Sequence, residues 1–232
     1  MTNVDQLVIF DLDGTLVDSV EQISRILNLA RMDFGVPPQP QWFYEELIGL
    51  PVKELLSDLT IDSITRDNLI AHFRALLILD IQKGNVEIYP GVIELLQLLE
   101  HMQIGVAIAT SKPTKIAKEV VRCSTLSKFS IYVQGTDDFP PKPDPTVILR
   151  VITQFEGRAS LMVGDRTEDV IAAKRASIGA IGIAASAHSE AQLTDVGAAQ
   201  TFKSILHFYE AIKDDASLEQ KLSFLSRLSS TK

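Results

Sequence analysis

Residues 7–19 read LVIFDLDGTLVDS and place two acidic side chains directly after an apolar run. Side chains two positions apart in an extended strand point to the same side, so we expect the carboxylates of Asp11 and Asp13 to converge at a strand's carboxyl end. Two carboxylates that close repel each other, and one takes up a proton unless a cation lies between them. The stretch therefore predicts a cation site, although Asp13-Gly14 is also a strong signal for a hairpin turn.

Three later segments place polar side chains just past a predicted strand or just before a predicted helix. They are Thr110 and Ser111 after IGVAIA, Lys142 in PPKPDP, and Asp165 and Asp169 in VGDRTEDV. Each has a structural alternative, because Ser, Thr and Asp often cap helices and a turn lysine is often solvated. Together they predict one site, because ligands of parallel α/β sheets bind beyond the carboxyl ends of the strands.

These residue types suit a metal-assisted reaction at phosphorus. Asp11, Asp13 and Asp165 offer the hard oxygen ligands that Mg²⁺ prefers when it also binds a phosphate. Lys142 and Thr110 add a positive charge and a hydroxyl for an anionic group. One carboxylate can attack phosphorus to form an aspartyl phosphate, and a second can protonate the leaving oxygen and then activate water. The set predicts Mg²⁺-dependent hydrolysis of a phosphate monoester.

The pattern of apolar residues places this site on an α/β fold. From residue 86 on, predicted strands alternate with predicted helices, which is typical of a parallel sheet covered by helices on both faces. Residues 19–85 are helical in patches and interrupt the alternation after a first strand at residues 5–10. We therefore predict a Rossmann-like core of residues 1–18 and 86–232, with an inserted all-helical cap of residues 19–85. The tail, residues 214–232, is expected to be a docked helix or partly frayed.

Composition limits the class of protein. The chain has 232 residues, 46% of them hydrophobic, and a formal net charge of −8. An acidic chain is not expected to bind nucleic acid non-specifically. The partner that we predict is instead the substrate of the chemistry above, a small phosphorylated metabolite. The single cysteine, Cys123, permits no internal disulfide, fits the cytoplasm and is expected to be buried and inert. No apolar run reaches the length of a membrane span, and the sequence does not indicate an oligomeric state.

The motifs DLDGTLVDS, ATSK, KPDP and GDRTED resemble, in this order and spacing, the four motifs of the haloacid dehalogenase superfamily. The resemblance implies a Rossmann-like core with an inserted helical cap and Mg²⁺ as cofactor. It implies that Asp11 is the nucleophile and that Asp13 is the general acid and base, whose main-chain carbonyl also binds the metal. It assigns the remaining residues to the phosphoryl group and to the metal: Thr110, Ser111 and Lys142 to the first, and Asp165, supported by Asp169, to the second.

Within this superfamily the segments IGLPVKELL and YPGV look most like phosphoglycolate phosphatase-like members. The presence of Asp13 argues against dehalogenases and phosphonate-cleaving members. A hexose phosphomutase is the alternative, but such enzymes carry a histidine and a cap arginine where this chain has Ile23 and Val52. A regulatory or binding member without turnover is a further alternative, although every acid of the motifs is present. Arg166 stands where small residues are more usual.

In the predicted cap, Trp42, Phe43 and Tyr44 are expected to be part of its core rather than a substrate platform. Lys53 follows a Gly-Leu-Pro turn and could meet a carboxylate or a second phosphate. We expect it to point to solvent instead, as lysines at helix starts commonly do.

Overall fold

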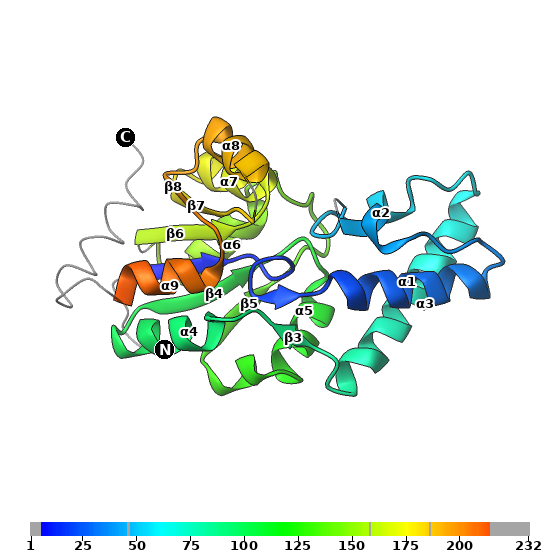
Figure 1. Cartoon of the computed structure of the whole chain (residues 1–232), viewed down its shortest axis with the longest axis horizontal. Helices are drawn as coiled ribbons and strands as arrows, with labels where there is room; N and C mark the ends of the chain where they lie inside the picture. The colour runs from blue at the N-terminus through cyan, green and yellow to red at the C-terminus, as the bar shows by residue number, and fades with distance from the viewer. Residues whose placement is uncertain (1–5, 46, 158, 186, 214–232) are drawn as a thin grey trace.

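The structure is a computed structural model, and it describes residues 6–45, 47–157, 159–185 and 187–213. Its centre is a six-stranded sheet with the strand order β5-β4-β1-β6-β7-β8 (Figure 1). Every neighbouring pair in this sheet is parallel. The strands are β1 (Gln6–Phe10), β4 (Gly105–Ala109), β5 (Ile131–Gln134), β6 (Ala159–Gly164), β7 (Gly179–Ile183) and β8 (Gln200–Phe202).

Helices cover both faces of the sheet, because successive side chains of a strand point to opposite faces. Val8 and Phe10 of β1 pack with one set of helices, and Leu7 and Ile9 pack with the other set. The predicted Rossmann-like α/β class is therefore confirmed. The first set is α4 (Val92–His101), α5 (Thr114–Arg122) and α9 (Ile205–Lys213), and the second is α6 (Thr146–Gln154), α7 (Thr167–Arg175) and α8 (Ala187–Val196). A short 3₁₀ helix, η2 (Thr125–Lys128), follows α5.

Between β1 and β4 the chain forms a helical unit, which extends from one end of the molecule in Figure 1. Its elements are α1 (Val20–Asp33), α2 (Gln41–Glu45), the 3₁₀ helix η1 (Glu54–Leu56) and α3 (Ser63–Gln82). A short antiparallel ladder of β2 (Val17–Asp18) with β3 (Glu87–Ile88) lies where the chain enters and leaves the unit. The division of the chain into a core and a cap stays a prediction.

Several local predictions differ from the structure. Asp13-Gly14 does form a turn, but not a hairpin, because β1 is bordered by β4 and β6 while β2 pairs with β3. The helix predicted after Pro51 is a single 3₁₀ turn of three residues, Glu54–Leu56. The strands β2 and β3 have two residues each, too few for a pattern to show in the sequence. The predicted tail helix lies outside the described residues.

Two predictions of burial are wrong. Trp42 is 69% exposed, whereas its neighbour Tyr44 on the five-residue helix α2 is completely buried. The two side chains lie on different sides of a helix too short to bury both. Cys123 is half-buried, and its Sγ lies 3.7 Å from a carboxylate oxygen of Glu119. Lys53 is exposed, as predicted.

An ion pair between a buried arginine and a more exposed aspartate stabilises the helical unit. Arg31 of α1 has a side chain only 1% exposed, and it donates two hydrogen bonds, of 3.0 and 2.7 Å, to the carboxylate of Asp58. It donates a third, of 2.7 Å, to the carbonyl of Pro37. These bonds satisfy a guanidinium that would be costly to bury alone. The hydrogen bonds from Arg31 hold the pKa of the Asp58 carboxyl below its usual range.

We expect the substitution Asp58→Asn to lower the free energy of unfolding by about 2–4 kcal/mol at pH 7, because it leaves Arg31 buried without a counter-charge. A carboxyl whose pKa is lowered by folding stabilises the fold above its unfolded pKa, near 4, and stops doing so as the pH falls through its folded pKa. The difference between the two proteins should therefore shrink as the pH falls below about 4. Urea unfolding at several pH values measures it.

The control is Asp67→Asn, which removes an exposed carboxylate from α3 of the same unit. It should change stability little at any pH. A loss in Asp58→Asn that is the same at pH 7 and pH 3 would contradict the assigned role of the charge.

Candidate active site

The carboxyl ends of three neighbouring strands meet at one edge of the sheet. Asp11 directly follows β1, Thr110 follows β4, and Asp165 follows β6. The amide of Asp11 donates to the carbonyl of Val163 in β6 across 2.9 Å, so the ladder continues past the last residue of β1. The buried strands thus fix the backbone positions from which these side chains extend.

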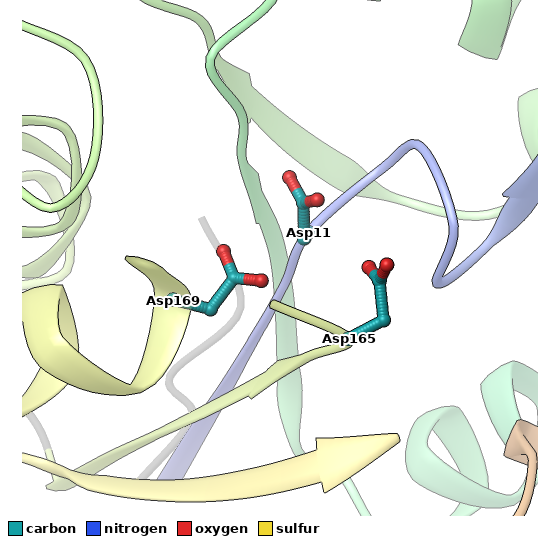
Figure 2. A group of neighbouring side chains, drawn as sticks. All are labelled: Asp11, Asp165 and Asp169. Carbon is teal, nitrogen blue, oxygen red and sulfur yellow. The ribbon is translucent and has the colours of Figure 1, made fainter. Parts of the chain in front are cut away.

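Three carboxylates gather at this edge, as Figure 2 shows. One oxygen from each of Asp11, Asp165 and Asp169 lies within 4.8 Å of the other two. Asp11 and Asp169 are buried and Asp165 is half-buried. Burial raises the pKa of Asp11 to about 7 and the pKa of Asp165 well above its usual range. A cation between them would let all three carboxylates remain ionised at neutral pH.

Lys142 places a positively charged side chain within this cluster of carboxylates. Its ammonium donates to Asp11 Oδ1 across 2.7 Å, to the carbonyl of Ala109 across 3.0 Å, and to Asp169 Oδ1. Burial alone would lower the pKa of Lys142, but the charges of Asp11 and Asp169 raise it. The alternative of a solvated turn lysine is therefore wrong, since Lys142 is 4% exposed. Asp169 Oδ2 also accepts the amide of Arg166 across 3.0 Å, so Asp169 caps α7, the structural alternative for this residue, as well as binding Lys142.

Asp13 lies beside this cluster and is not one of its three carboxylates. The extended backbone ends at β1, and the chain then turns through Gly14, which has a φ of +81°. The carboxylate of Asp13 pairs with the ammonium of Lys112 across 3.1 Å, and both side chains are largely buried. Because Gly14 has no Cβ, the carboxylate of Asp165 can lie directly against it. The two acids of the first motif thus enter different charge pairs.

Two of the residues predicted to hold a phosphoryl group, Thr110 and Ser111, lie on the loop after β4. Thr110 is 2% exposed, and its hydroxyl accepts the amide of Lys112 across 3.2 Å. Ser111 is half-buried and lines the cavity described below. Neither residue caps α5, whose N-cap is Pro113. The structure brings both residues to the carboxyl edge of the sheet, and their contact with phosphate stays a prediction.

Sequence reasoning gave no role to three residues that make contacts at this site. Thr15 donates its hydroxyl to Asp165 Oδ1 across 2.8 Å, and Lys112 forms the ion pair described above. Both stand inside the motifs DGT and ATSK, so the motifs themselves carried the signal. Arg166 donates from Nη1 to the carbonyl of Ile48 in the helical unit across 3.1 Å. No local pattern indicates that contact, because it joins residues far apart in the sequence.

A cavity of about 350 Å³ lies between this edge of the sheet and the helical unit. Asp13, Ser111 and Lys112 line it on the side of the sheet, and residues of α1, η1 and α3 line it on the other side. The charged cluster therefore borders a space that can hold the remainder of a bound molecule.

A family model described as haloacid dehalogenase-like hydrolase matches residues 8–183, which hold all four motifs. The chain belongs to this family. The matched residues include Asp11 and Asp165 themselves, all of β6 and the last three residues of β1.

Two relatives of this hydrolase are phosphatases. A phosphoglycolate phosphatase of Pseudomonas aeruginosa is 32% identical over 186 residues, which cover 76% of this chain and 68% of that protein. A phosphoglycolate phosphatase of Vibrio parahaemolyticus is 32% identical over 195 residues, which cover 79% of this chain and 86% of that protein. The predicted family and the predicted enzyme class, a phosphatase, are confirmed by these matches.

Solved structures share the fold of this hydrolase. A hydrolase from Pseudomonas syringae has a TM-score of 0.73 at 24% identity, covering 91% of this chain and 100% of that one. A protein from Thermotoga maritima described as a β-phosphoglucomutase has a TM-score of 0.71 at 25% identity, covering 90% and 99%. In the part of the chain that the structure describes, we find no helix with the length and apolar character that a membrane span needs.

We expect Mg²⁺ to stabilise this hydrolase against heat by binding at the acid cluster. A cation at 100 times its Kd adds about 2.7 kcal/mol to the free energy of unfolding, which corresponds to a rise in Tm of roughly 5–10 °C. The substitution Asp165→Asn should remove most of this rise, because it removes one of the clustered carboxylates. The matched control is Asp195→Asn, which removes an exposed carboxylate from α8. Equal rises in the two variants would contradict this site.

Proposed function

We propose that this chain is a Mg²⁺-dependent phosphatase that hydrolyses a small phosphate monoester through an aspartyl phosphate on Asp11. The observation that supports it most is the buried charge cluster at the edge of the sheet. Its three carboxylates, when ionised, and the ammonium of Lys142 leave a net charge of −2, which a divalent cation balances. The phosphatases among the relatives support the same chemistry, and phosphoglycolate is the substrate that their names suggest.

The residues at the cluster fit Mg²⁺, which prefers carboxylate and carbonyl oxygens. Asp11, Asp165 and the main-chain carbonyl of Asp13 would hold it, with Asp169 in support. Bound there, Mg²⁺ would neutralise charge on the phosphoryl oxygens during transfer. Thr15 keeps the carboxylate of Asp165 in place through its 2.8 Å hydrogen bond.

Asp11 carries the nucleophilic oxygen in this proposal. Its carboxylate follows a strand that is hydrogen-bonded on both sides, so its position is rigid. Lys142 binds one of its oxygens and places a positive charge beside the approaching phosphoryl group, which lowers the repulsion between the two anions. Thr110 and Ser111 would bind the phosphoryl oxygens from the loop after β4. The oxygen of Asp11 forms a bond to phosphorus while the bond from phosphorus to the alcohol oxygen breaks.

Asp13 is the general acid and base in this proposal. Its carboxylate lines the cavity in which the alcohol part of the substrate would lie. There it can give a proton to the leaving oxygen and later take one from the water that cleaves the aspartyl phosphate. Lys112 orients this carboxylate across 3.1 Å.

We further propose that residues 19–85 act as a cap that closes over the site. The ladder of β2 with β3 lies at both crossings of the chain and can serve as the hinge. Arg166 beside Asp165 reaches the carbonyl of Ile48 in the cap, and a Cβ at Gly49 would lie 2.7 Å from the Arg166 side chain. This contact lets the cap approach the metal side of the site. Closure would exclude water from the phosphoryl group.

A hexose phosphomutase is less well supported. The Thermotoga maritima protein shares the fold, but the two positions at which the resemblance places a mutase histidine and arginine are Ile23 and Val52. Both line the cavity, and neither can exchange a proton or bind a phosphate with its side chain. A binding member without turnover is also less well supported, because the four acids of the motifs are present and three are clustered.

We expect substitution of Asp11 and of Asp13 to block different steps of the reaction when p-nitrophenyl phosphate is the substrate. Asp11→Asn removes the nucleophile, so turnover and the phosphorylated protein should both be absent. Asp13→Asn keeps the nucleophile, and a good leaving group needs little protonation, so Asp11 should still be phosphorylated. Its hydrolysis should be slow, so the aspartyl phosphate accumulates. Intact-protein mass spectrometry after an acid quench measures the added phosphoryl group.

The wild type should turn over this substrate only with Mg²⁺ and should stop when a chelator is added. Near-native turnover by Asp11→Asn would show that a metal-activated water attacks phosphorus directly and would reject the proposed nucleophile. Full activity in the presence of a chelator would contradict the proposed requirement for Mg²⁺.

A further inference from the structure

We infer that the substrate of this enzyme is the phosphate ester of an apolar alcohol of several carbon atoms, rather than of a small hydroxy acid such as glycolate. This inference rests on the proposed phosphatase function and concerns the group attached to the phosphate. It is carried by the wall of the cavity next to Asp13 and by the positions of the cations around it.

The inner wall of the cavity is built from buried apolar side chains of both the helical unit and the sheet side. Each of the six that follow is at most 5% exposed. They are Ile23, Leu55, Ile70, Phe73, Leu77 and Ile116. The first five belong to α1, η1 and α3, and Ile116 belongs to α5. An alcohol that leaves the phosphoryl group at Asp13 would therefore extend along an apolar surface.

A carboxylate next to the phosphate would lack a suitable partner in this wall. Lys112 is the cation beside Asp13, and the carboxylate of Asp13 already binds it across 3.1 Å. Lys53 and Arg74 also line the cavity, but both are exposed at its rim. The carboxylate of phosphoglycolate would thus lose its hydration against apolar side chains, which is costly.

The volume of the cavity also favours a phosphate ester of a larger alcohol. About 350 Å³ is within the range of small-molecule sites, and a two-carbon acid would leave much of it unfilled. Each buried methylene contributes about 0.8 kcal/mol, which is about a fourfold gain in kcat/KM. An alcohol of several carbons would therefore be preferred by one or two orders of magnitude over methanol.

The test is a series of n-alkyl phosphates from methyl to hexyl, assayed with the wild-type enzyme and Mg²⁺, together with isobutyl phosphate and phosphoglycolate. Isobutyl phosphate has nearly the shape of phosphoglycolate, with two methyl groups in place of the two carboxylate oxygens. We expect kcat/KM to rise about fourfold per methylene until the cavity is filled. We expect isobutyl phosphate to exceed phosphoglycolate by at least tenfold.

Two variants show where the preference arises. Val52→Asp places a carboxylate on the half-buried lining and should flatten the dependence of kcat/KM on chain length. Leu79→Asp is the matched control, because Leu79 is 56% exposed on α3 and is not among the lining residues. This variant should keep the wild-type dependence.

The outcomes separate the two claims. If p-nitrophenyl phosphate is hydrolysed but the alkyl series is flat, or phosphoglycolate equals or exceeds isobutyl phosphate, the inference about the substrate is overturned and the phosphatase function stands. If none of these esters, including p-nitrophenyl phosphate, is hydrolysed with Mg²⁺, both claims are overturned. The wild-type series decides this even if a variant does not fold.

Discussion

The balance of charge around one buried lysine is the constraint on which the site depends. Lys142 binds Asp11 and Asp169 at the same time, and its place is fixed by a further bond to the carbonyl of Ala109 at the end of β4. Three carboxylates this close would otherwise repel one another strongly. One ammonium offsets only part of that repulsion, and the remaining charge is what makes the cluster suited to a divalent cation.

The parallel sheet makes this arrangement possible, because it brings the ends of β1, β4 and β6 to the same edge. The helical unit then adds a wall whose buried side chains are apolar, opposite to the charged edge of the sheet. Asp13 stands where the two meet. This geometry supports two separate roles. The residues at the strand ends would bind the phosphoryl group, which every substrate shares. The helical unit would contact the alcohol, which differs between substrates.

The strand-end residues could be predicted from sequence because their signal is local. A buried apolar run followed at once by Asp11 or Asp165 indicates both the strand and the place where it ends. The pairing of Asp13 with Lys112 could not be derived in this way, because the rule for alternating side chains holds only in an extended strand and β1 ends at Phe10, before both acids. The contact of Arg166 with Ile48 depends on how distant segments pack, and no periodicity carries that information. Trp42 shows the same limit, since a short helix can bury Tyr44 and leave its neighbour in solvent.

The central claim is that Asp11, and not water, makes the first bond to phosphorus. The stereochemical course at phosphorus tests it most directly, using a phosphorothioate monoester made chiral with ¹⁸O and hydrolysed in water enriched in ¹⁷O, so that the released thiophosphate is itself chiral. Each in-line displacement inverts phosphorus, so transfer to Asp11 followed by hydrolysis predicts net retention of configuration. Net inversion would mean a single displacement by water and would contradict the account.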